Sequence, residues 1–455
     1  MYGLSGSVGS IIRNDREQPI NIIKLRRKNM IISDLIDILK SDSLKERFNE
    51  IYVDPDLYEK QKQRCLDAVE CFVTAFGPEG DVSIFSAPGR SEIAGNHTDH
   101  QHGEVLAASI NRDAIAIARK NNDKKVRLIS DGSELICVDI TDPAVKDDEK
   151  GTTAGIIRGM LYAVNDHGFI PGGFDAYVTS EVLIGAGLSS SAAFETLIGV
   201  TESYLYNDGS ISATEIAIMG QYAENVFFGK PCGLMDQMAC SVGSLVHIDF
   251  KDPRVPHTEQ IKYDFAKSSY RLCITDTKGS HADLTADYAA VPAEMRSAAA
   301  FFGKEVLREV PEKDFYNAIP ELRKTCGDRA VLRGLHFYNE NRRVAEDVAA
   351  LKASDIKSFL KGVQASGDSS FKYLQNVYTN ADVLHQNVSV ALAVSEAVLN
   401  GRGACRVHGG GFAGTIQAWV PEDLCSEYKK ALDHVFGEGS CEILCIRPCG
   451  GIKLI

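Results

Sequence analysis

The chain has 455 residues, long enough for two or three domains, because a single hydrophobic core stops growing near ~250 to 300 residues. Its composition, 44% hydrophobic and 24% charged with 39 glycines, is that of an ordinary globular protein and argues against widespread disorder. The formal net charge of -13 argues against a nucleic-acid partner, which normally requires a basic face opposite the phosphates.

Three features indicate where the protein works. Residues 1–29 are rich in Gly, Ser, Asn and basic residues without periodicity, and we interpret them as an N-terminal tail. The sequence has no apolar run of about 18 residues, and its N-terminus lacks an apolar core followed by a small-residue cleavage site. The twelve cysteines are scattered, as expected for thiols in a reducing compartment. We therefore predict a cytoplasmic protein without a membrane partner.

Helical and strand periodicities follow from residue 30 onward. Met30 opens an amphipathic run (MIISDLIDILKS), and residues 55–77 show apolar side chains at helical spacing before a Gly-Pro stop. A strand (VSIFSA) leads through Pro88-Gly89-Arg90 to residues 95–102 (GNHTDHQH), and two further strands are predicted after them (EVLAASI and AIAIARK). Residues 95–102, named here the polar octad, are therefore expected between strands.

The most informative stretch covers residues 174–205 and predicts a strand, a glycine-rich turn and a long helix. Beyond it, ATEIAIMGQYAENVFFG predicts a helix stopped by Gly229, and KPCGLMDQMACSVGSLVHIDF predicts a helix followed by a strand. Helices and strands alternate in the second half. Periodicity breaks between residues 251 and 268, so we predict two domains, residues 30–260 and 261–455.

The polar octad allows three interpretations. Its three histidines and one aspartate are ligands that a divalent transition metal prefers. It is alternatively a plain polar loop, or a clamp for a sugar, whose hydroxyls need many donors and acceptors. The octad alone does not decide between them.

The glycine-rich turn predicts a phosphate site. Glycines let the backbone approach a ligand, and serines at the start of the following helix suit its cap. The free N–H groups and positive dipole end of that helix attract an anion, and phosphate fits best. The segment lacks the Lys of a Walker loop, and a plain capped helix is the alternative. The predicted ATP-binding residues are Gly185, Gly187, Leu188, Ser189, Ser190, Ser191 and Ala192.

Two carboxylates follow the phosphate segment. Glu224 and Asp236 suit different tasks, because one carboxylate can hold Mg²⁺ against phosphate oxygens while another accepts a hydroxyl proton. Arg90, after Pro-Gly at a strand end, could pair with a catalytic carboxylate and keep it ionised, or meet phosphate charge. Taken singly, each is more often a solvated surface residue.

Four motifs in this order resemble those of the galactokinase branch of the small-molecule kinases, which also include homoserine, mevalonate and phosphomevalonate kinases. The resemblance spans residues 55–455. The motifs are APGRSEIAGNHTDHQHG (sugar signature), GLSSSAA (phosphate loop), PCGLMDQ (catalytic segment) and HGGGFAG (C-terminal glycine loop).

The resemblance implies an α+β fold, with an N-terminal mixed-sheet α/β domain, a C-terminal ferredoxin-like α+β domain and the active site between them. It also implies an ATP-dependent sugar 1-kinase that uses Mg²⁺ and converts galactose to galactose 1-phosphate. Its partners would be a sugar and ATP, and the protein would be a monomer or weak oligomer. The residues it assigns are Asp236 (catalytic), Arg90 (its cationic partner), Ser191 and Glu224 (magnesium), and His97, Asp99 and Tyr288 (sugar).

The sugar signature departs from the family pattern at two positions. Asn96 replaces a glutamate before His97, and His100 replaces a tyrosine. We predict that Asn96 binds the sugar near carbon six. Galacturonate becomes an alternative substrate, because a glutamate would repel its carboxylate by roughly 4 kcal/mol at about 4 Å and an effective dielectric near 20. His408 replaces a threonine without an evident reason.

Two rival classes of function remain. A metal-dependent hydrolase would use His97, Asp99, His100 and His102 to activate water, but it leaves the other three motifs unexplained. A non-catalytic sugar sensor would keep the fold and lose turnover. The phosphate loop, Arg90 and Asp236 are all present, so catalysis is the simpler expectation.

Overall fold

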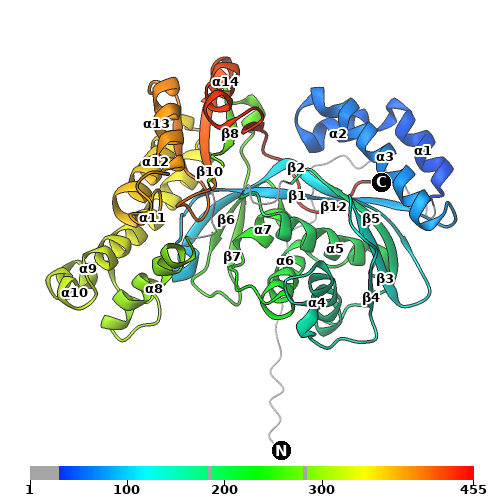
Figure 1. Cartoon of the computed structure of the whole chain (residues 1–455), viewed down its shortest axis with the longest axis horizontal. Coiled ribbons are helices and arrows are strands. Elements are labelled where there is room, and N and C mark those ends of the chain that lie inside the picture. Colours follow the sequence, from blue (N-terminus) through cyan, green and yellow to red (C-terminus); the bar gives the residue numbers. More distant parts are fainter. Residues whose placement is uncertain (1–29, 183–186, 280–283) are drawn as a thin grey trace, which may run out of the picture.

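The computed structural model describes residues 30–182, 187–279 and 284–455 (Figure 1). The helices of the N-terminal half are α1 (Ile32–Lys40), α2 (Lys45–Tyr52), α3 (Tyr58–Phe76), α4 (Thr153–Asp166), α5 (Ser190–Tyr206), α6 (Ala213–Tyr222) and α7 (Met235–Val242). Its strands are β1 (Ser83–Ala94), β2 (Glu104–Lys120), β3 (Lys125–Ser130), β4 (Ile136–Asp139), β5 (Phe174–Ser180), β6 (Leu245–Asp249) and β7 (His257–Ile261).

The C-terminal half carries the remaining elements. Its strands are β8 (Tyr270–Asp276), β9 (Ala404–Val407), β10 (Thr415–Pro421), β11 (Cys441–Leu444) and β12 (Ile452–Lys453). Its helices are α8 (Thr285–Phe301), α9 (Glu312–Asn317), α10 (Ile319–Thr325), α11 (Asp328–Lys352), α12 (Ile356–Ser369), α13 (Asn387–Leu399) and α14 (Cys425–Phe436).

The first sheet is mixed. Its strands run in the order β12-β1-β2-β5-β3-β4, with β6 and β7 added beside β2, and the pair β3–β5 is parallel. Strands β1 and β2 are long and cross the middle of the molecule in Figure 1. The mixed N-terminal sheet predicted from the sequence is confirmed.

Helices cover both faces of this sheet because alternate strand residues point to opposite sides. Ile84, Ile115 and Ile117 pack in one cluster with α1, α2 and α3. Phe85 and Ala116 pack in another cluster with α4, α5 and α6. Figure 1 shows these two helical layers above and below the sheet.

The prediction of two separate strands across residues 104–120 is wrong, because a single strand, β2, spans them. The polar residues between the two apolar runs suggested a break. They lie within the strand because their side chains have buried partners: Asn111 bonds to Tyr52 O and Cys445 N, and Asp113 pairs with arginines.

The second sheet has the strand order β11-β8-β10-β9, and all its neighbours are antiparallel. Numbered along the chain, this order is 4-1-3-2, that of a ferredoxin-like sheet, so the predicted α+β C-terminal domain is confirmed. Helices α13 and α14 share a buried cluster with it.

The chain passes between the sheets near the predicted boundary. The predicted boundary at residue 260 falls near the end of β7. This strand was not predicted because its sequence, HTEQI, is mostly polar. The last residues return to the first sheet, where β12 pairs with β1. A buried Arg447 anchors this return, with its Nη1 atom 3.1 Å from Asp113 Oδ2 and 2.8 Å from Ser86 Oγ. The predicted C-terminal domain, residues 261–455, includes these last residues, although β12 lies in the first sheet.

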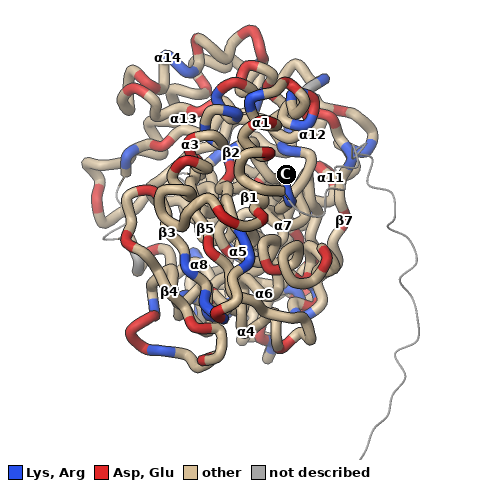
Figure 2. The backbone as a smooth tube through the Cα atoms, turned by 90° about the vertical axis from the view of Figure 1, so that its right-hand side faces the viewer, with Lys and Arg blue, Asp and Glu red and all other residues tan. Residues whose placement is uncertain are grey.

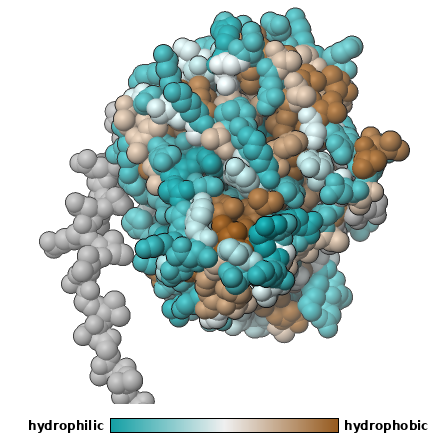
Figure 3. All heavy atoms as spheres, turned by 90° about the vertical axis from the view of Figure 1, so that its left-hand side faces the viewer, coloured by the Kyte–Doolittle hydropathy of each residue, from teal (hydrophilic) through white to brown (hydrophobic). Residues whose placement is uncertain are grey.

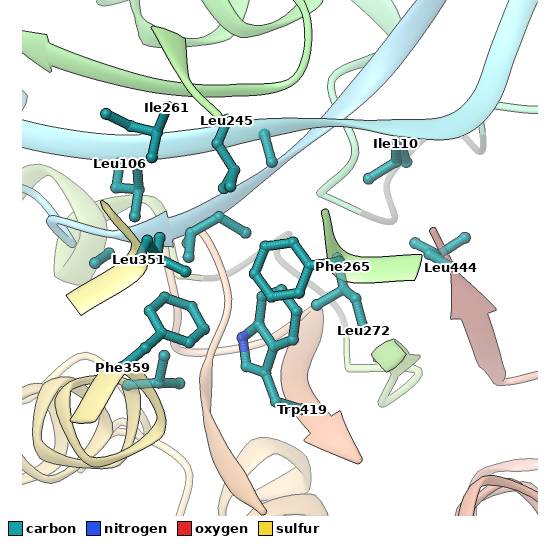
Figure 4. Packing of buried hydrophobic residues seen from close by; sticks show 14 of the residues in the cluster. Leu106, Ile110, Leu245, Ile261, Phe265, Leu272, Leu351, Phe359, Trp419 and Leu444 are labelled. Carbon is teal, nitrogen blue, oxygen red and sulfur yellow. The ribbon is translucent and has the colours of Figure 1, made fainter. Parts of the chain in front are cut away.

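A buried cluster joins the two halves of the chain. It combines Leu106 and Leu245 of the first sheet with Leu272 of the second. Trp419, the single tryptophan, is fully buried there, with its ring centroid 4.5 Å from Phe265 and 5.2 Å from Phe359 (Figure 4). This apolar contact fixes how the halves meet.

The surface is mostly polar. Acidic and basic residues are both scattered along the backbone in Figure 2. On the face formed by α8 to α13, Figure 3 shows separate hydrophobic patches among hydrophilic side chains. Within the described ranges, no helix has both the length and the apolar character needed to cross a membrane.

Replacing Trp419 with alanine should lower the free energy of unfolding by about 3 to 5 kcal/mol, because the vacated cavity lies where the two halves pack. Urea unfolding followed by circular dichroism measures the change. Val435→Ala, at a side chain that is 45% exposed, is the control and should change it by less than about 0.5 kcal/mol. A loss below about 1 kcal/mol at Trp419 would contradict the role of this cluster.

Candidate functional site

A bidentate ion pair lies at the centre of the candidate site. Arg90 Nε is 2.7 Å from Asp236 Oδ1, and Arg90 Nη2 is 2.7 Å from Asp236 Oδ2. Arg90 Nη1 also donates to Gly187 O of the phosphate loop. The pair thus joins strand β1, helix α7 and the phosphate loop, as the sequence analysis had anticipated for Arg90 and a carboxylate.

Local backbone geometry brings these elements together. The pairing of β1 with β2 shifts register between Pro88 and Arg90. A Cβ atom on Gly89 would lie 2.7 Å from Leu188 O, so only glycine lets the phosphate loop approach β1 this closely. Arg90 N then donates to Leu188 O at 3.0 Å. Asp236 lies in the first turn of α7.

The electrostatics keep Asp236 ionised. Burial alone raises the pKa of its carboxyl, but the charge of Arg90 and the hydrogen bonds from Arg90 and Ser189 outweigh burial and lower the pKa below its usual value. The same pairing raises the pKa of Arg90 against the effect of burial. A carboxylate that is ionised and held by two donors has a fixed orientation.

The phosphate loop differs from its prediction in one respect. Ser189 precedes α5 with a left-handed backbone (φ 58°), and its hydroxyl donates to Asp236 instead of capping the helix. The first N–H groups of α5 therefore have no side-chain cap and remain open to an anion. Ser190 and Ser191 begin the helix, followed by buried Ala192. Gly185 lies outside the described residues.

The two predicted magnesium ligands lie together. Ser191 Oγ is 3.2 Å from Glu224 Oε1, and Lys230 Nζ is 3.0 Å from the same oxygen. Gln237 Nε2 bridges Glu224 and Glu195 at 3.0 Å each. Burial, together with the charge of Glu224, raises the pKa of Glu195, whose Oε1 has no hydrogen-bond partner. This set of hard oxygen donors fits Mg²⁺.

Sequence reasoning missed Glu195 and Lys230. Glu195 lies four residues after Ser191 on the same helix, and that spacing could have identified it, because residues i and i+4 share one helix face. Lys230 lies within the segment between Glu224 and Asp236. Its contact with a buried carboxylate depends on the π-helical turn at Ala223–Phe228, which sequence periodicity does not reveal.

The polar octad lies between β1 and β2, as predicted. His97 has a left-handed backbone (φ 59°) and is buried. Its Nε2 lies 3.1 Å from Gly410 O, while its Nδ1 has no partner. Burial, and the neighbouring His100, lower the pKa of His97 to about 4, so the ring is neutral at pH 7. With Nε2 donating, Nδ1 is an acceptor of the kind that a sugar hydroxyl can use.

Tyr288 and Asp99 lie beside His97. The Tyr288 ring centroid is 5.5 Å from that of His97. Burial, then Asp99 and Asp236, raise the pKa of Tyr288 to about 12, which keeps the phenol a donor. A Cβ on Gly233 would lie 2.6 Å from Asp99 Oδ2, so the catalytic segment passes directly against the octad. The predicted sugar residues therefore border the Arg90–Asp236 pair.

Asn96 differs from its prediction. Its side chain is 0% exposed, and protein partners occupy both ends of its amide. A direct sugar contact would require one of these hydrogen bonds to break. The amide also lies against the carboxylate of Glu92, which is paired with Arg406, so a carboxylate remains next to position 96 although Asn96 itself is neutral. The link between Asn96 and galacturonate stays a prediction.

His408, which the sequence left unexplained, lies beneath the phosphate loop. Its Nε2 is 3.1 Å from Ser91 Oγ, and its Nδ1 is 2.9 Å from Thr415 Oγ1. A Cβ on Gly187 would lie 3.2 Å from His408 Nδ1. His408 thus fills the space between β1 and the loop. Burial lowers its pKa well below the usual value.

The metal-centre interpretation of the octad requires several of its side chains to converge. Within the part of the chain that the structure describes, no group of three His, Cys, Asp or Glu residues is placed to hold a metal ion. His97 bonds to Gly410 O, and Asp99 Oδ1 accepts from the His100 backbone at 2.9 Å.

A hollow of about 740 Å³ lies on the C-terminal half, between α12, α13 and the end of β10. Lys357, Lys361 and Glu396 are among its lining residues. None of the residues predicted for the site lines it, so the hollow and the candidate site are separate.

Comparison with known proteins agrees with this geometry. The galactokinase galactose-binding signature matches residues 70–120, and the N-terminal domain of GHMP kinases matches residues 155–244. A crystal structure of Lactococcus lactis galactokinase complexed with galactose has a TM-score of 0.72 at 26% identity, covering 86% of this chain and 100% of its own. A Methanococcus jannaschii mevalonate kinase shares the fold, with a TM-score of 0.58 at 15% identity.

The fold and the site therefore define a GHMP-type small-molecule kinase. Among curated relatives, the galactokinase of Actinobacillus pleuropneumoniae is 32% identical over 402 residues, covering 85% of this chain and 98% of the relative. The galactokinase of Streptomyces coelicolor is 31% identical over 363 residues, covering 79% and 89%. The chain belongs to the galactokinase family.

Asp236→Asn should lower the free energy of unfolding by about 1 to 3 kcal/mol at pH 7, because a neutral amide replaces an ionised partner of buried Arg90. Since the pKa of Asp236 is lowered in the folded state, its stabilisation is present above the unfolded pKa and disappears as the pH falls through the folded value.

Urea unfolding of both proteins between pH 7 and pH 2 should therefore show a difference that is constant near neutral pH and shrinks below about pH 4 to 5. The control is Asp423→Asn in the exposed pair with Arg402, which should change stability by less than about 1 kcal/mol. An equal difference at every pH would show that Arg90 does not depress the pKa of Asp236.

Proposed function

We propose that this chain is an ATP-dependent galactokinase that transfers the terminal phosphoryl group of ATP to the anomeric hydroxyl of galactose. The observation that carries the proposal is the Arg90–Asp236 pair, which touches the phosphate loop through Gly187 O and Ser189. The segment that carries Asp236 also passes against the octad, where Gly233 lies beside Asp99. In this proposal the ionised carboxylate of Asp236 lies between the phosphates of ATP and the sugar.

In the proposed reaction, the anomeric oxygen forms a bond to the γ-phosphorus while the bond from that phosphorus to the bridging oxygen of ADP breaks. Asp236 is the proposed acceptor of the hydroxyl proton, since its lowered pKa leaves it ionised at neutral pH. Arg90 fixes the orientation of the carboxylate with two hydrogen bonds. The uncapped first turn of α5, with Ser190 and Ala192, faces the phosphates.

The sugar contacts in this proposal come from three side chains. His97 offers an unpartnered Nδ1 acceptor, Asp99 offers a carboxylate, and Tyr288 offers a phenol donor. A neutral imidazole, a carboxylate and a phenol give the mixture of acceptors and donors that vicinal hydroxyls require.

Ser191 and Glu224 would hold Mg²⁺, and Glu195 adds a second carboxylate nearby. Mg²⁺ held by these residues would supply positive charge that neutralises the phosphates. Lys230, bonded to Glu224, holds a positive charge at the same place. We propose that the protein acts on ATP and sugar as a monomer or weak oligomer in the cytoplasm, where ATP is available.

The direct test is ATP- and Mg²⁺-dependent ADP release with galactose, galacturonate, N-acetylgalactosamine and glucose. Galactose should give the highest kcat/KM, and Asp236→Asn should lower kcat by at least about 100-fold, because it removes both the proton acceptor and the orienting charge. Asp423→Asn, far from the site, is the matched carboxylate control and should retain wild-type turnover.

Preference for galacturonate would overturn the substrate assignment, and sugar binding without ADP release would favour the sensor.

Glu224→Gln and Ser191→Ala should each raise the Mg²⁺ concentration for half-maximal activity by at least about tenfold, because each removes an oxygen from the proposed metal site. A titration of initial rate against free Mg²⁺ at fixed ATP measures this shift. Glu134→Gln, at an exposed loop position, is the control. Unchanged Mg²⁺ dependence in both site variants would place the metal elsewhere.

A further inference from the structure

Asn96 has its whole hydrogen-bonding capacity occupied by protein. Its Nδ2 donates to Glu92 Oε1 at 3.0 Å and to Gly409 O at 2.7 Å. Its Oδ1 accepts from Asn376 Nδ2 at 2.8 Å and from Ser370 Oγ at 3.3 Å. The side chain is completely buried. An amide in this position has both ends fixed and presents no free group to a ligand.

Glu92 is the partner that makes an amide necessary at position 96. Its carboxylate is buried and pairs with the fully buried Arg406 of β9. Two of the four partners of Asn96, Glu92 Oε1 and Gly409 O, are acceptors, so the group facing them must donate. A carboxylate at position 96 would oppose Glu92 across about the same distance, would leave Gly409 O without this donor, and would leave Glu92 Oε1 with Arg406 as its donor.

Further hydrogen bonds fix the backbone on either side of His97. His336 Nε2 lies 2.9 Å from Asn96 O, and Gly95 N donates to Glu340 Oε1 at 3.1 Å. On the other side, the glycine loop at residues 409–411 receives Asn96 at Gly409 and His97 at Gly410. Asn96 therefore ties the octad to α11, to the residues after α12 and to the glycine loop.

We propose that Asn96 is a positioning residue, which places His97 in the sugar site through Glu92 and the glycine loop and makes no contact with the sugar itself. This inference rests on the proposed galactose kinase function. In this proposal the residues at positions 92 and 96 depend on each other. One of them must carry a carboxylate and the other an amide that donates to it.

The first test compares galactose with 6-deoxy-D-galactose, which lacks the hydroxyl on carbon six, in wild type and Asn96→Asp. A positioning residue predicts that Asn96→Asp weakens the affinity for both sugars by the same factor, about 10- to 100-fold, because His97 shifts for both. A direct contact to carbon six predicts a loss for galactose alone. Calorimetric dissociation constants decide between them, and a loss confined to galactose would overturn the proposal.

The second test removes the proposed partner. In a Glu92→Gln background the side chain at 92 can donate, so Asn96→Asp should cost less than about threefold in affinity there. If the cost is the same in both backgrounds, Asn96 does not act through Glu92. This comparison is a double-mutant cycle and isolates the pairwise interaction.

A third readout needs no substrate. In Asn96→Asp two buried carboxyls would share a proton, so their folded pKa rises above the unfolded value of about 4 and stability falls as the pH increases from 4 to 8. The charged or titratable groups near positions 92 and 96 include Arg406, Arg90, His97, His336 and Glu340. The melting temperature of Asn96→Asp should drop over this range relative to wild type, and the Glu92→Gln double variant should not show the drop.

Asn111→Asp is the matched control, since Asn111 is also buried and bonded at both ends, to Tyr52 O and Cys445 N, without a carboxylate partner. Its effect should not change in the Glu92→Gln background. If wild type neither binds nor phosphorylates galactose, the proposed function fails while the melting measurement still tests the Asn96–Glu92 pair. An identical pH dependence in Asn96→Asp and wild type would contradict the pair.

Discussion

The guanidinium of Arg90 joins three elements that are far apart along the chain. Its hydrogen bonds to Asp236 and to Gly187 O hold α7, β1 and the phosphate loop at one point. Because Asp236 is otherwise destabilised by burial, the positive charge beside it decides its ionisation. The close approach at Gly89 and the uncapped start of α5 lie at this junction, and in the proposed function its carboxylate faces both the phosphates and the sugar.

The proposed sugar side of the site is built by both halves of the molecule. The octad lies between two strands of the first sheet, yet Asn376 and the glycine loop hold it from the C-terminal half, and Arg406 holds the end of β1 just before it. Their polar contacts are buried, and each would be costly if a partner were missing. The apolar cluster around Trp419 fixes the halves against each other, so the polar network can form with defined distances.

Much of the fold, and the pairing of Arg90 with a carboxylate, could be predicted from the sequence, because strong periodicities and four ordered motifs fall on continuous stretches. The misjudged features depend on distant partners. Asn111 and Asp113 suggested a break between two strands, because the sequence does not reveal the distant residues that pair with them in the core. Ser189 was predicted to cap α5, but Asp236 takes its hydroxyl. Asn96 was predicted to line the sugar, but Asn376 and Ser370, more than 270 positions away, enclose it.

We propose that the Arg90–Asp236 pair directs phosphoryl transfer from ATP to the anomeric oxygen of galactose. The most direct measurement is the ³¹P NMR spectrum of the product formed from galactose, ATP and Mg²⁺, with and without Asp236→Asn. For wild type we expect a phosphate signal coupled to the anomeric proton, and for Asp236→Asn that still binds galactose we expect this signal to form at least about 100-fold more slowly. Phosphate on another carbon, or the same signal at an unchanged rate from Asp236→Asn, would contradict it.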